Sequence, residues 1–192
     1  MPDHELLLAS TSRWRREILE SAGIQTRCIA PGVDERAVRI EDPVALVQEL
    51  AHQKAAAVAS QHSGRWVLGA DQMLFDEFGV WGKPANPEEH FERLCAMRGR
   101  GHTLATGFCV ITGDEKPIID VELTTLQVRA DLEDAELRAY VATGEGSQCA
   151  GGYAIEGRGA FLFAGYQGDY TNILGLPIFR VLDVLRRHGW RF

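Results

Sequence analysis

The sequence has no long apolar run and no excess of positive charge. None of its apolar stretches approaches the roughly 18 residues that a membrane-spanning helix needs. The first stretch, residues 6–9, is too short for a signal peptide and has no basic region before it. The formal net charge of −7 disfavours broad binding to nucleic acid. We therefore expect a cytoplasmic protein that acts on neither membranes nor nucleic acids.

The chain also lacks paired cysteines and internal repeats. Its four cysteines, Cys28, Cys95, Cys109 and Cys149, form no CxxC motif, which disfavours a zinc cluster or a redox dithiol. We expect separate reduced thiols that are mostly buried. With 192 residues, 45% hydrophobic and 24% charged, the composition is that of one soluble globular domain over residues 1–192.

Helical and extended patterns alternate in the first half of the chain, and a hairpin follows in the middle. The expected strands are residues 5–9, 25–30, 66–70, 102–112, 118–129 and 161–164. The expected helices are residues 13–22, 43–61, 87–99 and 176–188, with one of about ten residues capped by Asp131. The glycine-rich segment 144–159 should be mostly loop. This order predicts an α/β fold with a mixed, twisted sheet flanked by helices, in which ligands bind beyond the strand ends.

The segment LLLASTSRWRREIL, residues 6–19, leads from a strand through a hydroxyl-rich turn into a helix. Free N–H groups at a helix start, together with the helix dipole, form a ready anion site. Ser10 and Ser12 can donate hydrogen bonds to phosphate oxygens. The planar guanidinium of Arg15 can donate two parallel hydrogen bonds to two oxygens of one phosphate. Ser-Thr-Ser is also an ordinary helix cap, and the basic cluster of Arg13, Arg15 and Arg16 could be a solvated helix face. The residues alone leave both interpretations open.

Three charged residues further along could take part in phosphate chemistry. Asp71 should end the buried strand 66–70, where catalytic acids and metal ligands often lie, although a structural turn residue fits equally well. Lys54 lies among small and apolar residues of the helix 43–61, where it could bind an anion or extend its head to solvent. Lys83 stands between a glycine and a proline, which can fix a phosphate-binding lysine but usually marks a turn.

In their order along the chain, these segments resemble the Maf family of nucleoside triphosphate pyrophosphatases. The matching motifs are residues 9–19, VDE at 33–35, LAHQKA at 50–55, GADQ at 69–72, GKP at 82–84, TG at 106–107, CAGGYAIEG at 149–157 and GLP at 175–177. Several motifs in register over nearly the whole chain are far more specific than any one of them. The resemblance implies a Maf/inosine-triphosphatase-like fold and a homodimer.

The resemblance also implies a reaction, cleavage between the α and β phosphates to give a nucleoside monophosphate and pyrophosphate. Asp71 matches the family's proton acceptor, which would activate water or hold the divalent cation (Mg, Mn or Co) that the reaction uses. Glu35 matches an acidic position that would help to hold that metal. The positions that match phosphate contacts are Ser10, Arg15, Lys54 and Lys83.

Three positions bear on the nucleotide. Family members that act on dTTP and UTP carry Arg, Thr and Gln at the sites aligned with Trp14, Gln72 and Glu156, and this chain instead resembles the branch that acts on 7-methyl-GTP. The indole of Trp14 would attract the cationic 7-methylguanine ring, although it could merely pack on its helix. The carboxylate of Glu156 can accept both N1–H and the exocyclic amine of guanine, and thymine and uracil lack that amine.

The match to that branch is incomplete. Arg13 replaces the usual proline before Trp14, and the GGYAI part of the last loop is closer to the dTTP/UTP type. The sequence thus predicts a preference for 7-methyl-GTP or a similar modified nucleotide. A dTTP/UTP-type pyrophosphatase and a nucleotide-binding regulator of cell division are the alternatives.

Overall fold

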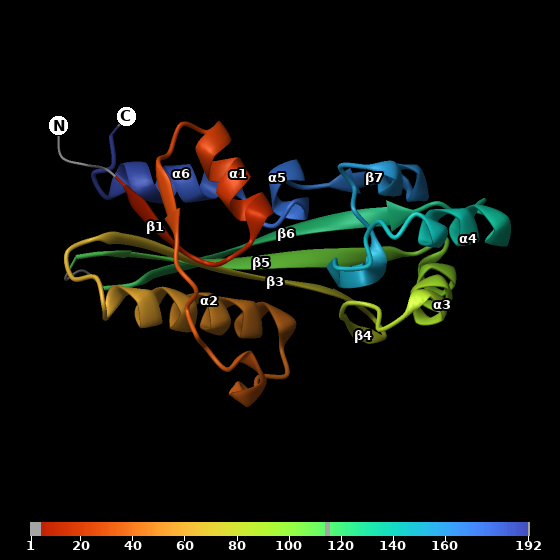
Figure 1. The fold of residues 1–192 in the computed structure, drawn as a ribbon, viewed down its shortest axis with the longest axis horizontal. Coiled ribbons are helices and arrows are strands. Elements are labelled where there is room, and N and C mark those ends of the chain that lie inside the picture. The colour runs from red at the N-terminus through yellow and green to blue at the C-terminus, as the bar shows by residue number, and fades with distance from the viewer. Residues whose placement is uncertain (1–4, 114–115, 192) are drawn as a thin grey trace. The chain divides into compact units, whose positions relative to one another are not determined.

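The computed structural model describes residues 5–113 and 116–191 (Figure 1). The strands are β1 (Leu6–Ala9), β2 (Thr26–Cys28), β3 (Trp66–Asp76), β4 (Gly79–Trp81), β5 (Gly101–Thr112), β6 (Ile118–Val128) and β7 (Phe163–Gln167). The α-helices are α1 (Arg13–Ser21), α2 (Pro43–Ala59), α3 (Pro87–Met97), α4 (Asp134–Ala142), α5 (Tyr170–Ile173) and α6 (Ile178–Arg187). The short 3₁₀ helices are η1 (Glu35–Ala37), η2 (Ala150–Gly152) and η3 (Arg158–Leu162).

The strands form one mixed sheet in the order β2-β1-β3-β5-β6-β7, with β4 paired to β3. β1 is parallel to both β2 and β3, whereas β4 and β7 run antiparallel to their partners. The predicted α/β fold with a mixed sheet and flanking helices is confirmed. In the described residues, no helix has the length and apolar character needed to span a membrane.

The chain divides into two compact units. Unit 1 comprises residues 1–72, 105–122 and 169–192, and unit 2 comprises residues 73–104 and 123–168. The chain therefore changes unit after residues 72, 104, 122 and 168. The expectation of one domain over residues 1–192 stays a prediction.

Alternation along β1 gives unit 1 a core on each face of its sheet. Leu6 and Leu8 are fully buried in a cluster that includes Phe108 of β5 and residues of α6. Leu7 and Ala9 point the other way, into a cluster with small residues of α2. Successive strand side chains alternate between faces, so four apolar residues in a row serve both layers.

Two glycines allow α2 to lie directly on the strands beneath it. A Cβ atom at Gly69 of β3 would stand 2.3 Å from the carbonyl oxygen of Ala51, and one at Gly107 of β5 would stand 2.4 Å from that of Val47. Neither position has room for a side chain, because the obstructing atoms belong to helix backbone. The close approach places Lys54 of α2 against the next residues of β3.

The helix starts mostly follow the sequence. The side chain of Ser12 caps α1, and α2 and α3 each begin with a capping side chain followed by proline, Asp42-Pro43 and Asn86-Pro87.

Two expectations about element boundaries were wrong. Asp71 does not end its strand, since β3 continues to Asp76. Asp131 does not cap α4, because its carboxylate accepts from Nε and Nη2 of Arg129 at 3.0 and 2.7 Å. Glu133 holds the cap position instead. The short helix α5 was not expected, and the last strand lies two to three residues later than predicted.

Candidate active site

The centre of the candidate site in unit 1 is one lysine held by two carboxylates. Lys54 Nζ lies 2.6 Å from Asp71 Oδ1 and 2.7 Å from Glu35 Oε1. Lys54 is only 6% exposed and Asp71 only 8%, whereas the Glu35 side chain on η1 is 54% exposed. A buried ammonium is stable only with such partners, which explains a lysine among the small residues of α2. The structure therefore brings together three of the residues singled out in the sequence.

Burial and nearby positive charges shift the pKa of Asp71 in opposite directions. Burial raises the pKa of this carboxyl, and the nearby positive charges of Lys54 and Arg15 oppose that rise. A raised pKa is typical of carboxylates that accept protons in catalysis. Only Oδ1 is bonded to Lys54, and the described residues give Oδ2 no hydrogen bond, so Oδ2 can accept a proton from water.

Arg15 is fixed beside this pair by backbone carbonyls. Its Nη1 donates to the carbonyl oxygen of Ala70 at 2.8 Å, and its Nε donates to that of Gly175 at 2.9 Å. Nη1 also lies 3.3 Å from Ser10 Oγ. Burial lowers the pKa of Arg15, opposed by the carboxylates of Asp71 and Glu35, yet a guanidinium keeps its charge in proteins. The guanidinium of Arg15 is therefore held rigidly against Ala70, the strand residue that precedes Asp71.

The serine turn is both a helix cap and a set of free donors. Ser12 Oγ accepts from the N–H of Arg15 at 3.4 Å, and Ser10 Oγ accepts from the N–H of Ser12 at 3.2 Å. These bonds confirm the cap interpretation for Ser12. They do not exclude phosphate binding, because each hydroxyl still has its own O–H to donate.

Gln72 follows Asp71 and is held in place by its amide nitrogen. Nε2 donates to Thr106 Oγ1 at 2.9 Å and to the carbonyl oxygen of Asn172 at 2.6 Å. Both N–H groups are thus engaged, and the carbonyl oxygen of the side chain is the atom left for a ligand. The sequence motif TG at 106–107 included Thr106 without a role, and Asn172 was not singled out.

Trp14 lies on the outer side of α1. It is 42% exposed and lines an apolar groove of about 410 Å³ together with Ile18, Tyr170 and Leu174. This environment suits stacking on a flat ring and also suits simple packing between helices. Its predicted role in reading the base stays a prediction.

Lys83 and Glu156 belong to unit 2, where both are exposed. The loop around Glu156 is anchored on both sides. The N–H of Ala154 donates to the Tyr140 hydroxyl at 3.1 Å, and the N–H of Gly159 donates to Glu145 Oε1 at 2.9 Å. Their predicted contacts with phosphate and base are likewise untested.

The two residues predicted to hold a metal, Glu35 and Asp71, both bind the ammonium of Lys54. Glu35 and Asp71 converge on one point, now filled by Lys54 Nζ. Within residues 5–113 and 116–191, no group of three or more His, Cys, Asp or Glu side chains could hold a metal. Mg²⁺ commonly takes one or two carboxylates and completes its shell with phosphate oxygens and water. Two carboxylates are within that number, and metal binding by this pair stays a prediction.

A mixed α/β sheet with a buried carboxylate–lysine pair beside a capped helix start is an arrangement suited to anionic ligands. The family model for Maf-like protein matches residues 5–188, and the chain belongs to this family. The resemblance seen in the sequence motifs is thereby confirmed at the level of the family.

Curated relatives match over nearly the whole chain. A dTTP/UTP pyrophosphatase of Symbiobacterium thermophilum is 40% identical, covering 97% of this chain and 95% of that protein. A nucleoside triphosphate pyrophosphatase of Synechococcus elongatus is 43% identical, covering 95% and 93%. Among solved structures, the Ham1 protein of Staphylococcus aureus matches with a TM-score of 0.45 and 15% identity over 66% of this chain and 72% of that one, too weak a likeness to bear on function.

Proposed function

We propose that the chain hydrolyses nucleoside triphosphates between the α and β phosphates, with dTTP and UTP as its preferred substrates. The observation that carries the reaction is the buried Lys54–Asp71 pair beside Arg15. The choice of nucleotide rests on the relatives named dTTP/UTP pyrophosphatase. These names support the pyrimidine alternative better than the preference for 7-methyl-GTP expected from the sequence.

Each residue of the candidate active site has a distinct role in this proposal. The hydroxyls of Ser10 and Ser12 and the fixed guanidinium of Arg15 bind phosphate oxygens. Lys54 offsets negative charge as the bond breaks, and Lys83 is proposed to do the same. Asp71 takes the proton from the attacking water through Oδ2. A divalent cation held by Glu35 and Asp71 would supply further neutralisation of the triphosphate charge.

Lys54 also keeps Asp71 ready for its role. Without a cation beside it, burial would raise the pKa of Asp71 further and favour the protonated form, which cannot act as a base. The ammonium bonded to Oδ1 favours the ionised form while leaving Oδ2 unbonded. One side chain therefore serves the base and the substrate charge together.

The test is pyrophosphate release from a panel of triphosphates: dTTP, UTP, CTP, ATP, GTP and 7-methyl-GTP, each with Mg²⁺, Mn²⁺, Co²⁺ or a chelator. We expect dTTP and UTP to have the highest kcat/KM. Asp71→Asn, which keeps the size of the side chain, should lower the rate by about 10²–10⁴-fold. No release with any triphosphate would overturn the reaction, and binding without release would favour a nucleotide-binding regulator.

A preference for 7-methyl-GTP is the second candidate, and Trp14, Gln72 and Glu156 favour it. The carbonyl oxygen of Gln72 and the half-exposed indole of Trp14 are both available for a base. The triple variant Trp14→Arg, Gln72→Thr, Glu156→Gln separates the candidates. If wild type prefers 7-methyl-GTP, the triple variant should shift towards dTTP and UTP. If wild type already prefers pyrimidines, the ranking should not change.

A further inference from the structure

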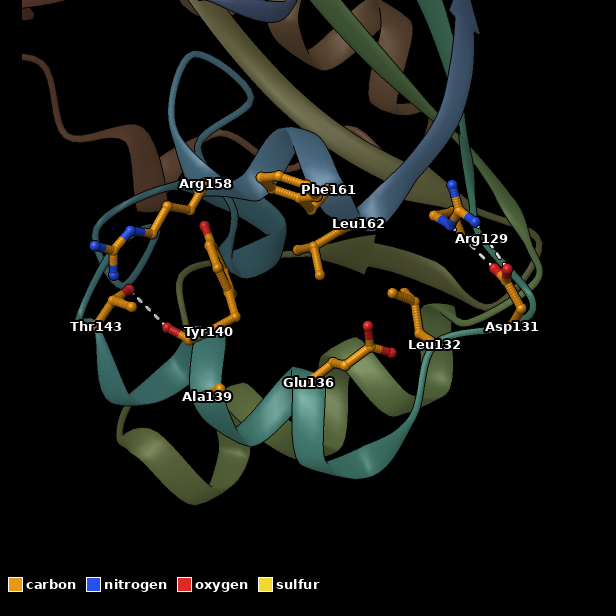
Figure 2. A pocket seen from close by; sticks show the side chains of 10 residues that line it. All are labelled: Arg129, Asp131, Leu132, Glu136, Ala139, Tyr140, Thr143, Arg158, Phe161 and Leu162. Carbon is orange, nitrogen blue, oxygen red and sulfur yellow. Dashed lines mark hydrogen bonds and ion pairs between the residues drawn. The ribbon is translucent and has the colours of Figure 1, made fainter.

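A pocket of about 600 Å³ lies wholly within unit 2, between α4 and η3 (Figure 2). Figure 2 shows Ala139 and Tyr140 of α4 on one wall and Phe161 and Leu162 of η3 on the other. Its volume is within the usual range for small-molecule sites. None of the residues proposed above to bind phosphate, metal or base lines it. The proposed reaction therefore leaves this pocket without a role.

The walls of the pocket suit a flat apolar ring. Leu132 and Leu162 are 8% and 4% exposed and form a buried apolar part of the lining, whereas Phe161 is 81% exposed. An exposed aromatic ring gains free energy when another ring covers it, both from buried area and from ring stacking. Phe161 is thus available to a ligand without any rearrangement of the core.

The charges around the pocket leave one cation for a ligand. Arg129 is bonded twice to Asp131, and the carboxylate of Glu136 accepts from the N–H of Glu133 at 2.8 Å. The side chain of Arg158, by contrast, has no ion pair or hydrogen bond with another residue of the described ranges. Figure 2 places its guanidinium beside Thr143, at the end of the pocket away from Asp131. The anion of a ligand would therefore bind at that end.

We propose that this pocket binds a small aromatic phosphate, with the ring against Phe161 and Tyr140 and the phosphate on Arg158. A guanidinium binds phosphate in a bidentate, charge-assisted way, which gives the ligand a fixed orientation. A nucleoside monophosphate, the product of the proposed reaction, has this chemistry, and so does a simple aryl phosphate. The site itself follows from unit 2 alone and does not depend on the reaction.

The experiment is calorimetric titration of the full chain with dTMP and, separately, with phenyl phosphate. Arg158→Gln should weaken binding by about tenfold or more, because a charge-assisted pair is lost. Phe161→Ala should weaken it by roughly threefold to tenfold, because one stacked ring is lost. Phe179→Ala is the matched control, since Phe179 is 73% exposed on α6 of unit 1. It should bind both probes like wild type.

Two further probes and one variant distinguish binding in this pocket from binding in the candidate active site. Thymidine and inorganic phosphate each carry only half of the ligand and should bind at least about tenfold more weakly than dTMP. Arg15→Gln, in the candidate active site, should leave phenyl phosphate binding unchanged. Where Arg158→Gln weakens the binding of both probes, tighter binding of dTMP than of phenyl phosphate would identify the nucleotide as the ligand of this pocket, and equal binding would identify a general aryl phosphate site.

The proposal is overturned if Arg158→Gln and Phe161→Ala bind like wild type, if only Arg15→Gln loses binding, or if neither probe binds below roughly 10 mM. Circular dichroism of each variant checks that it is folded, and both side chains are exposed enough to be replaced safely. Arg158→Gln should keep its rate of pyrophosphate release from dTTP. A wild-type chain that binds phenyl phosphate but releases no pyrophosphate would refute the proposed function and leave the pocket standing.

Discussion

Lys54 should determine the pH dependence of the proposed reaction, because its charge lowers the pKa of Asp71. Burial raises the pKa of Asp71 and Lys54 opposes the rise, so kcat/KM should fall on acidification through a pKa above the ordinary aspartate value of about 3.9. Removing the ammonium in Lys54→Met disfavours the carboxylate further. The acid limb should therefore move to higher pH, together with a loss of rate.

The control for this prediction is Lys54→Arg, which keeps a positive charge beside Asp71. Its acid limb should stay near that of wild type even if its rate is lower. An acid limb that moves to lower pH in Lys54→Met would contradict the assignment of Asp71 as the titrating base. The measurement is a pH profile of kcat/KM for dTTP.

Arg15 should matter for stability as well as for substrate. Its Nη1 and Nε satisfy the carbonyl oxygens of Ala70 and Gly175, which a lysine cannot reach as a pair. Arg15→Lys should lower the free energy of unfolding by about 1–3 kcal/mol, because a buried acceptor loses its donor. It should also raise KM for dTTP.

Urea unfolding measures the stability, with Arg16→Lys as the neighbouring control. The side chain of Arg16 forms an exposed ion pair with Glu20 at 3.7 Å, so its replacement should cost less than about 0.5 kcal/mol. Equal effects of the two substitutions would show that the carbonyl bonds of Arg15 contribute nothing.

At the level of single residues, the sequence pointed to polar and charged members of the candidate site but not to the groups that hold them in place. Ser10, Arg15, Lys54 and Asp71 were found because their types and order carry a chemical pattern. The carbonyl oxygens of Ala70 and Gly175 were not, since every residue has a carbonyl and only the fold selects these two. Asn172 was missed for the same reason, because Gln72 is bonded to its backbone.

Among the elements, the contact of α2 with the sheet is the feature most sensitive to a single methyl group. Gly69→Ala would drive a Cβ into the carbonyl of Ala51 and push the helix away from β3. We expect a loss of about 1–3 kcal/mol in the free energy of unfolding and a large loss of pyrophosphate release, because Lys54 moves with the helix.

Gly165→Ala is the control for that substitution. A Cβ at Gly165 of β7 would meet nothing within 4 Å, and the residue does not need positive φ. Its melting temperature and activity should match wild type. A stable and active Gly69→Ala variant would show that α2 can shift without disturbing Lys54.

Element boundaries show where local pattern is not enough. The apolar run of β3 stops at Ala70, so Asp71 looked like its end, yet Lys54, Thr106 and Asn172 satisfy the polar side chains that follow and the strand continues. Similarly, Asp131 and Glu133 both suit the start of α4. Arg129 decides between them by binding Asp131.

At the scale of the whole chain, one buried cluster contains residues from both ends of the sequence, from Leu6 to Trp190. Trp190 is 4% exposed and packs edge-on against Trp66, with ring centroids 5.4 Å apart. A chain that ends at Gly189 should lose about 3–5 kcal/mol of unfolding free energy, as expected when a buried tryptophan is removed. A chain that ends at Trp190 should unfold in urea like the full chain, and equal midpoints for the two would refute this.

The order of helical and extended patterns correctly predicted an α/β fold with a mixed sheet, but no local signal marked where the chain passes from one unit to the other. The changes of unit fall after residues 72, 104, 122 and 168, and three of the four lie within strands β3, β5 and β6. A strand has the same pattern on both sides of such a point. Only the packing of distant segments separates the two units.

This interleaving has a consequence for synthesis on the ribosome. All of unit 2 has been translated by residue 168, whereas unit 1 still lacks α6, which covers β1. The face of β1 that carries Leu6 and Leu8 therefore cannot be covered until α6 has been made, and these two side chains stay exposed until then. The nascent chain should depend on holding chaperones over that interval, and the phosphate binding proposed for residues 10–15 should begin only after release.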